Sequence, residues 1–178
     1  MARRLVMTLA MSLDGYIADE DGGYGWIKGD GNHALDTSNK WDYAAFLKGI
    51  DAVVMGRACY DQSMAGDFSD KTVFVATHRP TPDVGNVRFL SGDVCQAIRE
   101  ELAKPGKDIF LFGGGKVVDG FLKADMVDEY IIGIVPVILG GGRPLFYGGN
   151  APISLALTEC MLEEGIAILR YTRRPSEG

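Results

Sequence analysis

The hydrophobic residues of the chain fall into short continuous runs that alternate with polar and glycine-rich segments. Short apolar runs bounded by turn residues are typical of buried strands. Amphipathic stretches that open on an acidic residue and stop at lysine, proline or glycine are typical of helices. Strands are therefore expected at residues 3–11, 51–56, 71–76, 86–90, 109–112 and 127–135, and helices at residues 42–48, 57–65, 93–104 and 115–123.

This alternation of strands and helices indicates an α/β fold in three layers, with a largely parallel sheet between two layers of helices. Residues 153–162 and 165–173 are expected to form an antiparallel hairpin, turned at residues 163–165, which makes the sheet mixed. No segment has the composition of a linker. The chain of 178 residues is therefore expected to form a single domain over residues 1–178.

Two long segments, residues 19–40 and 136–149, are polar or glycine-rich. Long loops in compact domains often form binding sites or lids. Trp26 lies in the first of them and has two possible roles. It is either a lid aromatic that stacks on a ligand or a hydrophobic plug that holds the loop against the protein.

Charge and residue usage exclude several classes of protein. The chain has 18 basic and 24 acidic residues and a net charge of −6, which disfavours nonspecific binding to nucleic acid. No apolar run reaches the ~18 residues of a membrane span, and no signal-peptide pattern is present, so a cytoplasmic protein without a membrane partner is expected. The spacing of the cysteines and histidines indicates neither a disulfide framework nor a metal site. These residues are Cys59, Cys95, Cys160, His33 and His78.

The stretch IFLFGGGKVVDGFLK at residues 109–123 joins an apolar run to an amphipathic one through three glycines. A strand that ends in such glycines and continues at once as a helix leaves unpaired amides and the positive end of the helix dipole at the turn, and both attract anions. Val117 follows Lys116, so the stretch is not a Walker A loop, and the GxGxxG fingerprint is absent. The stretch therefore predicts a site for a phosphate-bearing ligand.

Two further junctions place a cation directly after a buried strand. Gly56 permits close approach of a ligand, and Arg57 offers a planar charged fork, although an ordinary surface arginine is its alternative role. Thr77, His78 and Arg79 follow the next strand. Ligands of open α/β sheets bind outside the carboxyl ends of strands. NADPH fits three such ends, with its pyrophosphate at the helix amides and its 2′-phosphate at Arg57 or Arg79.

The ordered segments MSLDGYIA, DAVVMGRACYD, IFLFGGGKVVDGFL and MVDEYIIGIVPVILGGGRPLF, followed by the closing hairpin, resemble a known family. They are similar to the reductase domain of bacterial bifunctional riboflavin-biosynthesis deaminase-reductases, and more closely to its stand-alone, dihydrofolate reductase-like relatives. The resemblance covers residues 4–173. It implies the dihydrofolate reductase fold, a three-layer αβα arrangement with a mixed, mostly parallel sheet, and NADPH across the carboxyl edge of that sheet.

The resemblance also implies which positions hold the cofactor, because these positions match the motifs of the family. Threonine is common in the family at the position of Cys59, where this chain has only a weak thiol donor. The implied contacts are Ala10 and Met11 at the nicotinamide, Gly56, Arg57 and Ala58 at the adenosine phosphates, Thr77, His78 and Arg79 at the adenosine end, and Gly114, Gly115, Lys116 and Val117 at the pyrophosphate.

Reduction by NADPH requires the protein to hold the nicotinamide against an electrophilic carbon and to supply a proton. Asp42 opens DYAAF, which resembles the D-x-A-x-F helix start of true dihydrofolate reductases, where the acid contacts the pterin; a helix N-cap is its alternative role. Asp14 is the second candidate catalytic acid, and an organising residue of the SLDG turn is its alternative role. The expected substrate wall consists of Trp26, Phe46, Tyr60 and Phe112.

Two departures from the riboflavin-pathway reductases concern the substrate. Those enzymes have a lysine where this chain has Thr8 and an acid where it has Phe112. Both residues are associated there with a phosphoribosyl substrate, so their absence argues against that substrate. Arg143 and Lys28 remain as other possible contacts for an anion.

We therefore expect an NADPH-dependent reductase that transfers a hydride to a C=N or C=O bond of a small pterin-, pyrimidine- or carbonyl-type substrate. An NADPH-binding sensor or interaction protein without turnover, and a true dihydrofolate reductase, are the alternatives. The apolar strand at residues 131–139 and the GGGRPLF loop suit a subunit interface, and the related domains generally form dimers, so a homodimer is expected. A central place in the sheet is the alternative role of that strand.

Overall fold

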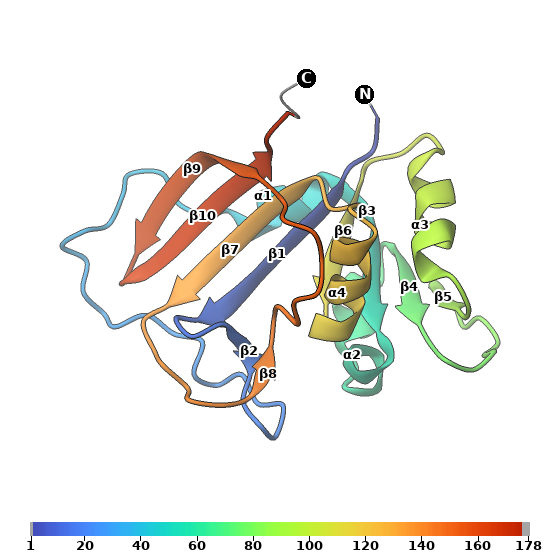
Figure 1. Cartoon of the computed structure of the whole chain (residues 1–178), viewed down its shortest axis with the longest axis horizontal. Helices are drawn as coiled ribbons and strands as arrows, with labels where there is room; N and C mark the ends of the chain where they lie inside the picture. The colour runs from blue at the N-terminus through green and yellow to red at the C-terminus, as the bar shows by residue number, and fades with distance from the viewer. Residues whose placement is uncertain (1, 176–178) are drawn as a thin grey trace.

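A mixed sheet forms the centre of the computed structural model, which describes residues 2–175. Its strands are β1 Leu5–Ser12, β3 Ile50–Gly56, β4 Thr72–Ala76, β5 Val87–Leu90, β6 Asp108–Gly113, β7 Glu129–Val135, β9 Leu155–Glu163 and β10 Ile166–Arg173. The sheet has eight strands in the order β5-β4-β3-β6-β1-β7-β10-β9. The strands from β5 to β7 are parallel, and β10 is antiparallel to both β7 and β9 (Figure 1).

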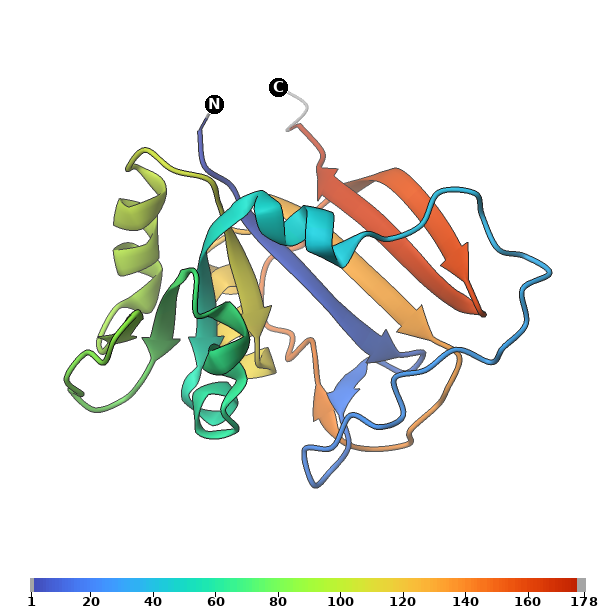
Figure 2. The same cartoon turned by 180° about the vertical axis from the view of Figure 1, so that it is seen from behind.

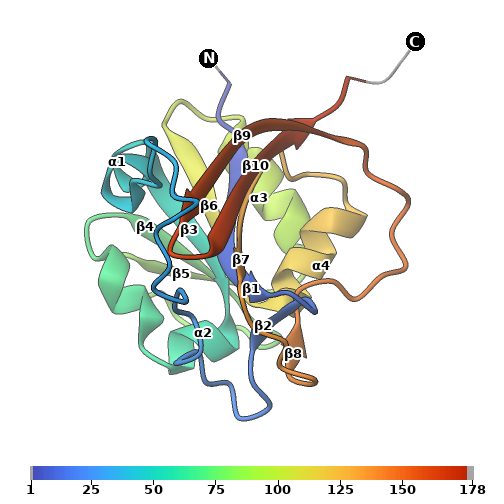
Figure 3. The ribbon, with the colours of Figure 1, turned by 90° about the vertical axis from the view of Figure 1, so that its left-hand side faces the viewer.

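Helices cover both faces of the sheet, so the expected three-layer αβα fold with a terminal hairpin is confirmed. One face carries α3 (Val94–Leu102) and α4 (Gly115–Lys123). The other carries α1 (Tyr43–Lys48), α2 (Arg57–Asp61) and the 3₁₀ helix η1 (Met64–Phe68). Figure 3 views the sheet with one layer of helices on each side.

The two cores on either side of the sheet follow from the alternation of side chains along each strand. In β3, Ala52 and Val54 pack toward α3 and α4, whereas Val53 and Met55 pack toward η1. All four are buried. The apolar run DAVVM therefore has no polar side, as expected of a parallel strand covered on both faces.

The expected continuous helix over residues 57–65 is wrong, because the helix ends after one turn. Ser63 adopts the left-handed conformation with a φ of 62°, which a right-handed helix cannot accommodate. The chain then begins η1, which places Phe68 in the core with 1% of its surface exposed. The break therefore turns the side chain of Phe68 into the core, whereas a continuing helix would direct it elsewhere.

Strand β7 lies between β1 and β10 and is almost entirely buried. Residues 131–135 are therefore not an exposed interface, and their alternative role as a central strand is confirmed. The following loop forms a second small sheet, in which β8 (Arg143–Pro144) pairs antiparallel with β2 (Tyr16–Ala18). The loop at residues 136–149 is thus not wholly irregular. Among residues 2–175, no helix has the length and apolarity needed to cross a membrane.

The second half of the long 19–40 loop is hydrogen-bonded to the hairpin turn of β9 and β10. Figure 2 shows the loop and the hairpin from behind. The amide of Thr37 donates to the carbonyl of Leu162 at 2.9 Å, and the amide of Leu162 donates to Thr37 Oγ1 at 2.9 Å. The amide of Glu164 donates to Asp36 Oδ1 at 2.8 Å. Residues 29–40 therefore form a segment held by backbone and carboxylate contacts.

His33 adds a pH-dependent contact to this segment. Its Nδ1 lies 3.0 Å from Asp36 Oδ2, and its Nε2 lies 3.5 Å from Glu164 Oε1. The hydrogen bond with Asp36 raises the pKa of His33 above its ordinary value. Because the folded-state pKa is raised, the contact stabilises the protein below the ordinary pKa, about 6.5, and is lost as the pH rises through the raised value.

We predict that His33→Gln lowers the melting temperature relative to the wild type at pH 6 but changes it little at pH 9. Only the protonated imidazole attracts the two carboxylates, so only the lower pH reveals the loss. Scanning calorimetry at both pH values measures the difference. His78→Gln is the matched control at the other, exposed histidine. An equal effect of His33→Gln at both pH values contradicts the assignment.

Candidate functional site

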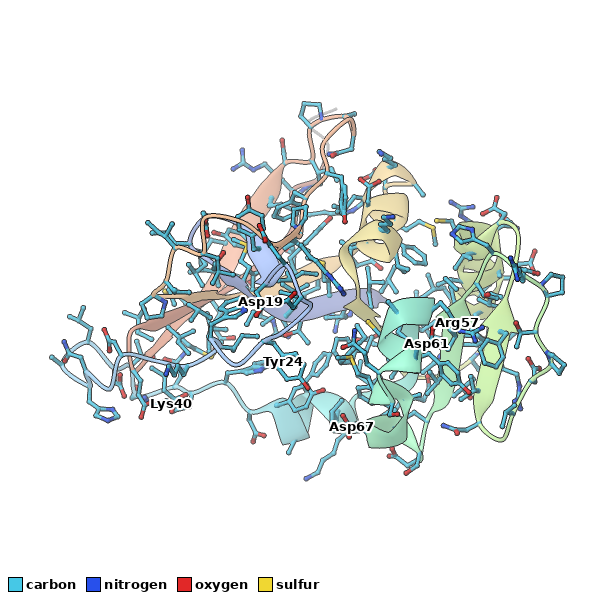
Figure 4. All side chains as sticks on the ribbon, turned by 90° about the horizontal axis from the view of Figure 1, so that it is seen from below. Asp19, Tyr24, Lys40, Arg57, Asp61 and Asp67 are labelled. Carbon is cyan, nitrogen blue, oxygen red and sulfur yellow. The ribbon has the colours of Figure 1, made fainter. Side chains whose placement is uncertain are left out.

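The carboxyl ends of three neighbouring parallel strands meet at one edge of the sheet. β3 pairs with β4 on one side and with β6 on the other, so the residues that follow these strands emerge together. They are Gly56-Arg57, Thr77-His78-Arg79 and Gly113–Lys116. Figure 4 looks onto this edge and shows Arg57 and Asp61 on α2. The structure therefore brings together the three junctions that the sequence marked separately.

The backbone at two of these junctions is closely packed. A Cβ placed on Gly56 would lie 3.1 Å from Val117 Cγ2 and 3.8 Å from the amide nitrogen of Gly114. Only glycine fits at position 56 without displacing Val117, which belongs to the first turn of α4. The Gly113–Gly114 peptide bond is cis, and Gly113 has a φ of 125°. The contacts of Gly56 show that the start of α4 lies directly beside the start of α2.

The start of α4 has no side-chain cap. Gly114 is its N-cap residue and offers no side chain to accept from the first amides of the helix. The amide of Val117 is used, since it donates to the carbonyl of Gly114 at 3.0 Å. The remaining first-turn amides and the positive helix end therefore face the junction, which is a suitable environment for a phosphate.

Arg57 is held in place rather than extended freely into solvent. Its Nε donates to Asp61 Oδ1 at 2.8 Å. Its guanidinium carbon lies 5.6 Å from the centre of the Tyr60 ring and 5.7 Å from that of Phe89, within the range of cation–π attraction. Half of the side chain is still exposed, so the guanidinium is oriented and accessible at the same time.

The junction after β4 is organised by its own threonine. The amide of Arg79 donates to Thr77 Oγ1, whose hydroxyl in turn donates to the Arg79 carbonyl. The amide of Thr77 donates to the carbonyl of Leu90 at 2.9 Å. His78 and Arg79 are exposed. The turn therefore presents the cation of Arg79 at the same edge as Arg57.

Cys59 lies where the two helix starts meet. Burial raises the pKa of its thiol, while the amides of Gly114 and Gly56 and the charge of Arg143 act in the opposite direction. The thiol is thus a neutral, half-buried group beside both junctions. Its position supports the implied correspondence with a family threonine that faces the phosphates.

Sequence reasoning missed how residues 143–147 complete this edge. A Cβ on Gly115 would lie 2.5 Å from the carbonyl oxygen of Pro144 and 2.9 Å from Tyr147 Cε2. This loop therefore packs directly on the start of α4. The sequence offers Arg143 as a possible contact for an anion, but the packing of residues 144 and 147 on α4 carries no local signal.

The end of β1 supplies Ala10 and Met11, which are half-buried. They pair with Gly133 and Ile134 of β7. Since β1 lies next to β6 in the sheet, these positions are at the same edge as the glycine junction. Their placement fits the nicotinamide contacts that the resemblance implies.

An aromatic cluster lies beside β6, on the face covered by α1 and η1. The ring of Phe110 lies 5.1 Å from that of Phe46 and 5.5 Å from that of Phe112, both in edge-to-face geometry. Phe68 lies 5.4 Å from Phe112. Phe46 and Phe112, two members of the expected substrate wall, are therefore in one cluster and are half-buried.

The other two members of the expected wall are elsewhere. Tyr60 packs edge-to-face on Phe89, with ring centres 5.0 Å apart, and therefore belongs to the Arg57 environment. Trp26 donates from its indole nitrogen to the carbonyl of Gly23 at 3.2 Å. This bond ties the indole to the 19–23 turn, and the ring is half-buried.

Asp42 is the N-cap of α1. Its Oδ1 accepts a hydrogen bond from the amide of Ala45 at 2.8 Å, and its backbone is extended. This geometry confirms the alternative role that the sequence allowed. The carboxylate is exposed at the start of the helix that carries Phe46. A catalytic role of Asp42 stays a proposal beside this structural one.

Asp14 has a structural role, beside which a catalytic role stays a proposal. The Ser12 hydroxyl donates to its Oδ1 at 2.6 Å, and the amides of Leu139 and Gly140 donate at 3.1 and 2.8 Å. The hydrogen bond from Ser12, followed by those from these amides, lowers the pKa of Asp14. A carboxylate that is ionised so readily is a poor proton donor near neutral pH.

Two shallow hollows lie outside the three junctions. One of about 280 Å³ is lined by Ala44, Leu47, Lys48, Asp70, Lys71 and Lys107. The other, of about 480 Å³, is lined by Asp19–Asp21 and Leu139–Gly141. Neither contains a residue of the three junctions. The chemistry of the strand ends, and not the depth of a hollow, therefore locates the candidate site.

Comparisons with known proteins agree with this fold. Residues 3–164 match the RibD C-terminal domain family. The chain belongs to this family. It is 33% identical over 155 residues to the uncharacterized protein YwjB of Bacillus subtilis, covering 83% of this chain and 84% of that one.

Two solved structures are similar along their whole length. A putative riboflavin biosynthesis protein from Shewanella sp. PV-4 superposes with a TM-score of 0.78 at 29% identity, covering 98% of this chain and 99% of that one. Dihydrofolate reductase from Enterococcus faecalis, solved in complex with NADP(H), superposes with a TM-score of 0.61 at 16% identity, covering 97% and 99%. The second likeness concerns the fold alone. Together with the family match, these likenesses establish a reductase-like fold.

We predict that Asp14→Ala lowers the melting temperature of the protein. The substitution removes an acceptor that joins the turn after β1 to the loop at 137–140, and it leaves two amides unpaired. Ser12→Ala, which removes one donor, should have a smaller effect. Thermal unfolding followed by circular dichroism measures both. A variant that melts like the wild type but loses reductase activity would support the catalytic role instead.

Proposed function

We propose that this protein is an NADPH-dependent reductase of small carbonyl or imine compounds. The observation that carries the proposal is the meeting of three strand-end junctions at one edge of a reductase-like fold. One junction offers uncapped helix amides, and two offer arginines. An extended ligand with separated phosphates matches that distribution better than a mononucleotide does.

In this proposal, the amides at Gly115 and Lys116 bind the pyrophosphate, and Val117 packs beneath it against Gly56. Arg57 and Arg79 flank the adenosine end, where Ala58, Thr77 and His78 complete the surface. Two guanidinium groups near one phosphate favour the 2′-phosphate of NADPH over the hydroxyl of NADH. Because Asp61 and two aromatic rings already orient Arg57, little side-chain entropy is lost on binding.

Ala10 and Met11 line the nicotinamide position in this proposal, and Phe46 and Phe112 provide a flat apolar wall for a planar substrate. NADPH supplies the hydride when it is bound, and the protein must hold the reacting atoms about 3–3.5 Å apart. The wall also excludes water from the reacting carbon. Asp42, at the start of the helix that carries Phe46, is the proposed source of the proton.

A second candidate function is NADPH binding without turnover. One observation favours it: both candidate acids accept hydrogen bonds from the backbone, Asp14 in a loop contact and Asp42 in a helix cap. The two phenylalanines of the proposed wall, Phe46 and Phe112, carry no exchangeable proton themselves. Incubating the protein with NADPH and a panel of pterins, pyrimidines and carbonyls distinguishes the two functions.

We also propose that residues 1–178 form one domain, since one sheet connects the elements from β5 to β9. The expected homodimer remains a proposal. The residues that suit it are the exposed apolar side chains of the loop after β7, Ile138, Phe146 and Tyr147. Sedimentation of the full chain tests this assembly.

We predict that the protein binds NADPH at least about 10-fold more tightly than NADH, which is the effect of one charge-assisted contact. Arg57→Ala should weaken NADPH binding by about 1–3 kcal/mol and should leave NADH binding less affected. Titration of cofactor fluorescence measures all of these affinities. The absence of saturable binding up to about 1 mM NADPH overturns the proposed function.

We predict different outcomes for two substitutions of Asp42. Asp42→Asn keeps an N-cap acceptor and should retain stability, whereas Asp42→Ala should lose about 0.5–2 kcal/mol of unfolding free energy. If Asp42 supplies the proton, both variants lose turnover although only one loses stability. Denaturant unfolding and NADPH oxidation measure the two effects. Full activity of Asp42→Asn shows that the carboxylate only caps the helix.

A further inference from the structure

We propose that Arg143 of β8 is an anchoring residue for the pyrophosphate of the cofactor, reaching the junction from the loop opposite the two helix starts. This inference rests on the proposed function and deepens it, because it names a contact outside the strand ends. Pro144, its neighbour, lies against the start of α4 at Gly115. The backbone of residue 143 is therefore fixed beside the uncapped amides of that helix.

The surroundings of the Arg143 side chain support this role. Its guanidinium lies against the turn at residue 22, where a Cβ on Gly22 would be 2.8 Å from Nη2 and 3.0 Å from Nη1. Its charge also acts on the thiol of Cys59, which is beside the amides of Gly56 and Gly114. The guanidinium therefore contacts the 19–23 turn, while the next residue, Pro144, contacts the start of α4.

No neighbouring carboxylate among residues 2–175 forms an ion pair with Arg143, so its guanidinium is available to an anionic ligand. Arg57, across the junction, shares its charge with Asp61 through Nε. Arg143 is exposed, and within residues 2–175 it takes part in none of the ion pairs. In a protein with a net charge of −6, a pyrophosphate needs a local cation to offset the surrounding field. Arginine suits this task because its fork can donate to two phosphate oxygens.

The contact between Arg143 and Gly22 links cofactor binding to the 19–23 turn. Gly22 has a φ of +86°, and Asp19 Oδ1 accepts from the amides of Asp21 and Gly23 at 3.0 and 2.7 Å. This tight turn presents its backbone to the flat guanidinium. When a phosphate fixes Arg143, the turn gains a fixed surface to pack against. Cofactor binding should therefore slow amide exchange at residues 19–23.

The test compares the wild type with Arg143→Ala, Arg143→Lys and the control Arg99→Ala, which removes the same charge from an exposed position on α3. We expect Arg143→Ala to raise the NADPH dissociation constant roughly 10- to 100-fold, Arg143→Lys to raise it less, and Arg99→Ala to leave it unchanged. Inorganic pyrophosphate should compete with NADPH in the wild type and much less in Arg143→Ala. Thermal unfolding verifies that every variant is folded.

Amide hydrogen exchange gives a second readout, which a purely structural role of Arg143 would leave unchanged. NADPH should protect residues 19–23 in the wild type and not in Arg143→Ala. A folded Arg143→Ala variant that binds NADPH and pyrophosphate like the wild type overturns the inference. If that variant is impaired only in turnover, the anion at Arg143 belongs to the substrate instead of the cofactor. If the wild type itself binds no NADPH, the proposed function fails together with the inference, whereas failure of the variant comparison alone leaves the proposed function standing.

Discussion

The close approach of two backbones, at Gly56 and at Gly114, is the constraint on which the candidate site depends. A side chain at position 56 would collide with Val117 in the first turn of α4. Because β3 and β6 are neighbours in a parallel sheet, their carboxyl ends must emerge side by side. Glycine at position 56 allows the two following helices to begin within van der Waals distance. The amides at the start of α4 are then left without a side-chain cap.

Three arginines are central to the proposed site of this acidic protein. Arg57 and Arg79 follow two neighbouring strands, and Arg143 belongs to the loop that packs on the start of α4. Several carboxylates are occupied in caps instead, as Asp42 is in α1 and Asp93 is in α3. In the proposed function, a few local cations bind an anionic ligand without making the protein a general binder of polyanions.

The long loops acquire their positions from contacts across large sequence separations. Asp14 joins the turn after β1 to residues 139 and 140, β2 pairs with β8, and Asp36 joins the 29–40 segment to the hairpin turn. These polar contacts replace the apolar packing that fixes the helices. They explain why loops rich in glycine can still present Trp26 and Arg143 in defined places.

The sequence alone determined the order of strands and helices, because apolar runs, caps and glycine turns act locally. It also identified the residues of all three junctions, since Gly56-Arg57, Thr77–Arg79 and the glycines at 113–115 each carry a local signal. Only the tertiary structure decided which aromatic residues share a cluster, that Ser63 ends α2, and that β7 is central rather than an interface. It also decided that Asp14 joins two loops and that residues 144 and 147 pack on the start of α4. Those facts depend on contacts between residues far apart in the chain, which no local pattern of residue types encodes.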